Sequence, residues 1–111
     1  MEMVKKYRLT ENTRVYHGHT LYRIEALRDF GDVKKGDLGG FIEKEENLSH
    51  NGDCWVYNFA YVFENARVLN AAKVLEFARV FGNATISSYS KVYGDSKICD
   101  NAKIGGYSKI H

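Results

Sequence analysis

Residues 53–111 form a six-residue repeat: DCWVYN, FAYVFE, NARVLN, AAKVLE, FARVFG, NATISS, YSKVYG, DSKICD, NAKIGG and YSKIH. The second position of every hexad holds a small residue, and the fourth holds Val or Ile without exception. Side chains two residues apart lie on the same side of a strand, so we expect both positions to face inward. A short fixed period of this kind indicates a repeat architecture.

The remaining positions of the hexad are expected to turn the chain. The sixth position is always Asn, Glu, Gly, Ser or Asp, which suits polar turns and backbone with positive φ. A helix is excluded, because its period of about 3.6 residues would spread the apolar residues around its surface. A second period of 18 residues relates Asn47, Asn65, Asn83 and Asn101. It predicts three hexads per coil, with the asparagine side chains stacked as a ladder.

These repeats resemble the hexapeptide-repeat, left-handed parallel β-helix proteins. The turn pattern of that family is matched by Val80-Phe81-Gly82-Asn83-Ala84 and by Val92-Tyr93-Gly94-Asp95-Ser96. The segment from Tyr22 to Tyr57 is also similar to the YdcK-like uncharacterised proteins of bacteria and their prophages. The resemblance implies a left-handed coil, and the predicted fold is an all-β triangular prism of parallel strands, a little over three coils tall.

Residues 1–46 lack the repeat and are predicted to cap the β-helix of residues 47–111. Residues 13–26 are expected to form a hairpin that turns at His17-Gly18, although their apolar spacing also permits a helical turn. Residues 30–40 hold four glycines and are interpreted as turns. Such a cap would cover the first coil, whose unpaired backbone groups otherwise invite aggregation. The chain stops at His111 without a second cap, so end-to-end pairing with another copy is expected.

Composition argues against several classes of protein. No apolar run reaches transmembrane length, and no signal peptide opens the chain, so no membrane association is expected. Cys54 is predicted to face inward and Cys99 outward, about two and a half coils apart, which disfavours a disulfide. The expected location is therefore the cytoplasm, or the host cytoplasm for a phage-encoded protein. The net charge of +2 is too small to imply nucleic-acid binding by itself.

Outward aromatic residues suggest a protein interface. The repeat places five large residues along one corner of the prism: Tyr57, Phe59, Leu75, Phe77 and Tyr93. Ile110 and His111 extend this predicted interface to the end of the last coil. A contiguous exposed apolar stripe usually marks a binding surface. The alternative is that the N-terminal cap folds over these side chains.

Two columns of cations suggest an anion-binding surface. Lys73, Lys91 and Lys109 are predicted to stack behind Trp55, and Arg79 and Lys97 behind Tyr61. Stacked like charges repel modestly, and aromatic neighbours would suit a nucleic acid. The alternative, which we favour, is a solvated face that limits aggregation.

Histidine chemistry is the remaining candidate activity, because many hexapeptide-repeat enzymes are acyltransferases with a histidine base. The histidines here are His17, His19, His50 and His111, and no long loop or C-terminal helix accompanies them. His17 and His19 alone would not form a closed metal site. We therefore expect no catalytic residue, cofactor or metal. The predicted function is a non-enzymatic, homo-oligomeric protein-binding module of phage type, for example an inhibitor of host defence. The alternatives are an acyl- or nucleotidyl-transferase and a nucleic-acid-binding protein.

Overall fold

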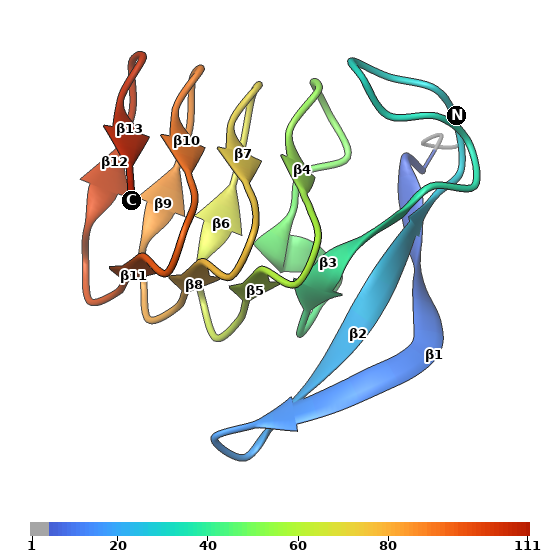
Figure 1. The fold of residues 1–111 in the computed structure, drawn as a ribbon, viewed down its shortest axis with the longest axis horizontal. Coiled ribbons are helices and arrows are strands. Elements are labelled where there is room, and N and C mark those ends of the chain that lie inside the picture. The colour runs from blue at the N-terminus through green and yellow to red at the C-terminus, as the bar shows by residue number, and fades with distance from the viewer. Residues whose placement is uncertain (1–4) are drawn as a thin grey trace.

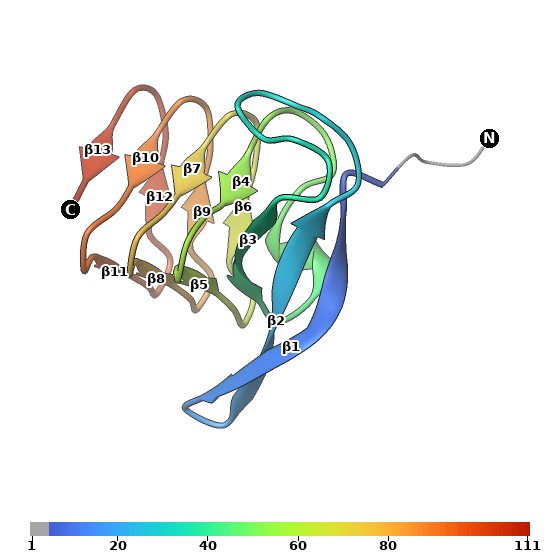
Figure 2. The same ribbon diagram turned by 45° about the vertical axis from the view of Figure 1, so that its right-hand side comes forward.

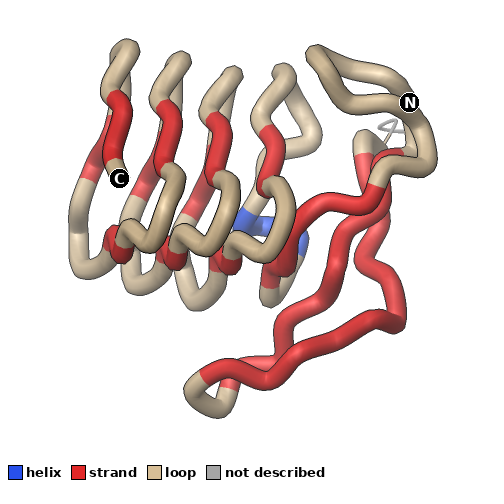
Figure 3. Tube along the Cα trace, in the orientation of Figure 1, coloured by secondary structure: helices blue, strands red, loops and turns tan. Residues whose placement is uncertain are grey.

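The computed structural model describes residues 5–111 and confirms an all-β solenoid (Figure 1). Ten two-residue strands build the coils: β4 (Trp55–Val56), β5 (Tyr61–Val62), β6 (Arg67–Val68), β7 (Lys73–Val74), β8 (Arg79–Val80), β9 (Thr85–Ile86), β10 (Lys91–Val92), β11 (Lys97–Ile98), β12 (Lys103–Ile104) and β13 (Lys109–Ile110). Figure 1 shows the coils advancing side by side from β4 to β13, and the coil is left-handed, as the family resemblance implied. Short strands alternate with turns along the whole prism (Figure 3).

Parallel pairing confirms three hexads per coil. Residues 18 apart are partners on all three faces, as in Lys73 with Lys91 and Lys91 with Lys109. The inward Val and Ile side chains are fully buried from Val56 to Val92. The residue at the sixth position of each hexad, from Asn58 to Gly106, has positive φ, as predicted. Six of these residues are not glycine. Each turn therefore holds a conformation that L-residues adopt only at a cost, and neighbouring coils must stabilise it.

The asparagine ladder is confirmed for three of its four members. The Asn65 side-chain amide donates to Asn83 Oδ1 at 3.3 Å, and the Asn83 amide donates to Asn101 Oδ1 at the same distance. The prediction was wrong for Asn47, which is buried and instead accepts the backbone N–H groups of Glu43 and Lys44. Asn47 is out of register with the ladder because the first coil is two residues longer than the 18-residue coils that follow. Leu48 accordingly pairs with Val68, twenty residues further along the chain.

The N-terminal cap consists of β1 (Tyr7–Tyr16), β2 (His19–Ala26), β3 (Leu38–Ile42) and the 3-10 turn η1 (Glu45–Asn47). β1 and β2 form the predicted hairpin, with positive φ at both His17 and Gly18. Figure 2 shows this hairpin alongside β3, which lies between it and the prism. The end of the hairpin packs against the coil, where Tyr16 contacts Tyr61. Within residues 5–111, no helix has the length and apolar character needed to cross a membrane.

The glycine-rich segment differs from its prediction, because Gly39 and Gly40 lie in strand β3 rather than in a turn. β3 pairs antiparallel with β2 and parallel with β5, and so joins the cap to the coil. A Cβ on Gly39 would lie 2.5 Å from the Val56 carbonyl oxygen, and one on Gly40 would lie 2.6 Å from that of Ala60. Glycine is required here for close approach of two backbones, not for a turn.

Candidate functional site

The cap covers some of the outward aromatic residues and leaves others free. Trp55 is only 1% exposed, because Phe30 and Tyr7 pack edge-on against its ring. Tyr61 and Phe63 are buried as well, with Tyr16 of the hairpin packed against both. The cap therefore covers these three residues of the coil, none of which belongs to the predicted interface.

The predicted interface residues occupy two neighbouring columns at one corner. Phe59 and Phe77 are 40% and 54% exposed, and their rings stack with centroids 5.8 Å apart. The other column holds four partly or fully exposed side chains: Tyr57, Leu75, Tyr93 and His111. This column already makes contacts within the chain, because the Tyr57 hydroxyl donates a hydrogen bond to Asp32 Oδ1 at 2.8 Å. Ile110 is half-buried and packs against the core. The role of all these residues as an interface remains a prediction.

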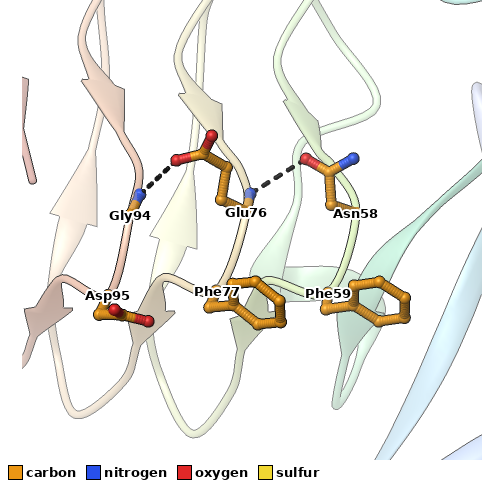
Figure 4. Close-up of a pocket in the computed structure, with 6 residues that line it drawn as sticks. All are labelled: Asn58, Phe59, Glu76, Phe77, Gly94 and Asp95. Carbon is orange, nitrogen blue, oxygen red and sulfur yellow. Dashed lines mark hydrogen bonds between the residues drawn. The ribbon is translucent and has the colours of Figure 1, made fainter.

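A shallow groove of about 500 Å³ runs along this corner (Figure 4). We call it the Phe groove, and six residues line it: Asn58, Phe59, Glu76, Phe77, Gly94 and Asp95. Side-chain-to-backbone hydrogen bonds join its successive turns, because Asn58 Oδ1 accepts the Glu76 N–H at 3.1 Å and Glu76 Oε1 accepts the Gly94 N–H at 2.8 Å. These bonds hold the turns in register, so the rings of Phe59 and Phe77 present a fixed apolar surface.

Arginines of the hairpin border the Phe groove at its cap end, a feature that sequence reasoning missed. The guanidinium carbons of Arg14 and Arg23 each lie 5.3 Å from the Phe59 ring centroid. Arg23 also donates to the Asn58 carbonyl at 3.2 Å. Burial, together with the nearby Arg14 charge, lowers the pKa of Arg23. The hexad repeat could not predict this position, because Arg14 and Arg23 lie outside the repeat. Only the pairing of β1, β2 and β3 brings them to the corner.

The predicted cation columns form, but two members are already engaged. Lys73 lies 3.4 Å from an Asp32 carboxylate oxygen. Arg79 donates to the carbonyls of Phe59 and Phe77 at 2.9 and 2.8 Å, and its guanidinium lies 3.8 Å from the Tyr61 ring centroid. The rest of the predicted anion-binding residues make no ion pair with the described part of the chain: Lys91, Lys97 and Lys109. Anion binding by these columns remains a prediction.

A second pocket, of about 380 Å³, contains the histidine best placed for chemistry. His19 lies on one wall, with Lys97 and the stacked rings of Phe63 and Phe81 close by. His19 Nδ1 is 2.9 Å from a Glu43 carboxylate oxygen, and Nε2 is 3.4 Å from one of Glu64. The hydrogen bond to Glu43 raises the pKa of His19 above its ordinary range.

The other histidines are less suited to catalysis, and the acidic residues do not form a metal site in the described part of the chain. His50 has a structural role, because its ring stacks on Tyr7 and its Nδ1 accepts the backbone N–H of Lys6 at 3.1 Å. His17 lines the second pocket from the hairpin turn, and His111 packs against Tyr93. Across residues 5–111 there is no group of three or more His, Cys, Asp or Glu side chains arranged to hold a metal ion.

Comparison with known proteins agrees with the fold. No protein-family model matches the chain. A 63-residue stretch is 36% identical to a protein of Escherichia coli (strain K12) named "Uncharacterized acetyltransferase YdcK". The match covers 50% of this chain and 19% of that relative, so it spans about a fifth of the relative's length. The chain is thus a hexapeptide-repeat β-solenoid with sequence similarity to YdcK.

Proposed function

We propose that this protein is a non-enzymatic protein-interaction module that binds through the Phe groove. The observation that carries the proposal is the exposed, stacked pair of Phe59 and Phe77 on a hydrogen-bonded column of turns. Exposed aromatic rings that cluster on a rigid surface are the usual energetic centre of a protein interface. A rigid scaffold also loses little conformational entropy when a partner binds.

The surroundings of the rings support a protein partner. Arg14 and Arg23 lie at one end of the Phe groove, and Asp95 lines the other. An apolar centre with a charged rim is the ordinary composition of a specific interface, and arginine is enriched there. Inhibition of a host defence protein is one form that such an interaction would take, in line with the resemblance to prophage proteins.

Photocrosslinking tests the proposal even while the partner is unidentified. A benzophenone amino acid replaces Phe77 in the full chain, which is expressed in Escherichia coli and irradiated. The matched control carries the same group at Tyr107, which is 79% exposed and stacks on Tyr89 in a separate turn column. We expect discrete protein adducts, with itself or with another protein, from position 77 only. Adducts from both positions alike, or none from position 77, would refute the proposal.

A second candidate function, acyl transfer, is supported by the His19 pocket and by the name of the E. coli relative. An acceptor hydroxyl or amine that displaces Glu64 from Nε2 would leave His19, held by Glu43 through Nδ1, as the general base. Lys97, on the rim of the same pocket, would attract the phosphates of an anionic acyl donor. Neither acceptor nor donor is identified by these contacts.

Thermal-shift measurements discriminate between the two functions. Acetyl-CoA and nucleotides would be added separately to the wild-type chain and to His19→Gln and Lys97→Gln variants. A rise in melting temperature that Lys97→Gln abolishes, with acetyl transfer that His19→Gln abolishes, would favour the enzyme. The interaction function predicts no shift with these compounds and unaltered crosslinking by both variants.

A further inference from the structure

We propose that the partner fitting the Phe groove is a second copy of this chain, packed antiparallel about a two-fold axis that passes between Phe59 and Phe77. The inference rests on the interaction function above and names its partner. A two-fold interface uses the same patch on both subunits, so the patch must be complementary to itself when it is turned by half a revolution. The Phe groove and its borders have this property.

The side chains along the corner follow a symmetric order. Phe59 and Phe77 lie at the centre with their rings 5.8 Å apart. Beyond Phe59, towards the cap, the guanidinium groups of Arg14 and Arg23 lie 5.3 Å from its ring. Beyond Phe77, in the opposite direction, Asp95 occupies the same column one coil further on, a step of about 4.8 Å (Figure 4). Cations thus lie beyond one ring of the pair and a carboxylate beyond the other.

An antiparallel copy would match each feature with its complement. The two-fold axis exchanges Phe59 of one subunit with Phe77 of the other, so four rings form one apolar cluster. The same operation brings Asp95 of one subunit to the arginine end of the other, and it does so twice. A parallel arrangement would instead place arginines against arginines, which costs free energy.

These charges are available for a partner. Within the part of the chain that the structure describes, Arg14, Arg23 and Asp95 form no ion pair within 4.0 Å. Both guanidinium groups already lie against aromatic rings, which removes part of their hydration before any partner arrives. Pairing them with a carboxylate therefore requires less further desolvation than pairing a fully hydrated cation would.

Reciprocal charge reversal tests this arrangement in the full chain. Sedimentation velocity measures self-association of the wild type, of Arg14→Glu, of Asp95→Arg, of the double variant, and of an equimolar mixture of the two single variants. Lys103→Glu, an exposed residue of β12 on another face, is the matched control. Circular dichroism verifies that each variant is folded. If a charge reversal fails to fold, the alanine variant at the same position, Arg14→Ala or Asp95→Ala, is measured in its place.

The expected pattern is specific to the two-fold axis. The wild type and Lys103→Glu dimerise, while each single reversal weakens dimerisation by about tenfold or more, because both symmetry-related contacts become repulsive. The mixture restores association as a heterodimer, because Glu at position 14 then faces Arg at position 95 while the second contact stays native. The double variant dimerises for the same reason.

Three outcomes would overturn the inference: a wild type that stays monomeric up to about 1 mM, a dimer insensitive to both reversals, or a mixture as dissociated as its components. Its failure is distinguishable from that of the interaction function. A monomeric chain that still gives discrete adducts with another protein from position 77 retains the function and loses only the self-partner.

Discussion

Replacement of Gly39 by alanine tests the junction between cap and coil most directly. The new methyl carbon would lie 2.5 Å from the Val56 carbonyl oxygen, 2.7 Å from Ile24 Cγ1 and 2.8 Å from Trp55 Cζ2. Because the Val56 oxygen belongs to the backbone, no side-chain rotation relieves the contact, and β3 must move by at least about 0.5 Å. That shift stretches the hydrogen bond from the Phe41 N–H to the Ala60 carbonyl, now 2.9 Å long.

We expect Gly39→Ala to lower the free energy of unfolding by about 1.5–3.5 kcal/mol. Overpacking at a buried site costs roughly 1–3 kcal/mol, and a weakened strand hydrogen bond adds about 1 kcal/mol. The reduced entropy of the unfolded chain returns about 0.5 kcal/mol. This loss is a large fraction of the roughly 5–15 kcal/mol that is typical of a small domain.

Urea denaturation measures this loss with two probes. The fluorescence of Trp55, the only tryptophan and buried at the junction, reports on the cap, and far-ultraviolet circular dichroism reports on the whole chain. Gly105→Ala is the matched control, since its methyl would meet nothing closer than Ser87 Oγ at 3.5 Å. We expect the control to stay within about 0.5 kcal/mol of wild type. Equal midpoints for both variants would show that the close approach of β3 to β4 is not real.

Three further predictions concern the turns, the link between cap and coil, and the cysteines. Ser88 has φ of 59°, so Ser88→Val should cost about 1–2 kcal/mol in urea denaturation and Ser88→Gly should cost nothing. The hydrogen bond from Tyr57 lowers the pKa of Asp32, so its stabilisation is present above the ordinary pKa and is lost as pH falls through the lowered value. Tyr57→Phe should therefore reduce the acid sensitivity of the midpoint, whereas an unaltered acid limb would argue against this link. Burial raises the pKa of Cys54, so a thiol reagent should modify Cys99 alone in the native protein, and rapid modification of both would contradict the structure.

The sequence was a reliable guide wherever the repeat is intact. The inward Val and Ile positions, the turn conformations and the stacking of Asn65 on Asn83 all follow from one hexad and its 18-residue period. The reason is that neighbouring coils make the same contacts again and again, so one local pattern determines many long-range ones. Asn47 escaped prediction because two extra residues in the first coil shift its register, and no residue type marks that insertion.

The candidate site could be predicted only in part. Phe59 and Phe77 were identified from the repeat, and the structure places them side by side. Arg14 and Arg23 were not, because they come from a hairpin whose register slips between Leu9 and Thr13, and an irregular pairing leaves no periodic signal. His19 was one of four histidines in the sequence, and only folding brought Glu43 and Glu64 to its ring.

By itself, the sequence determined the coil: its period, its inward side chains and the columns of outward ones. The reason is that each hexad obeys the same local rule and stacks on a copy of itself. Only the tertiary structure decided which aromatic residues the cap covers and which remain free, because that depends on where an irregular segment packs. β3 pairs with β5 through Phe41 and Ile42, beside two glycines that lie against the coil backbone. The cap that this pairing anchors buries Trp55 and Tyr61, while Phe59 and Phe77 stay exposed.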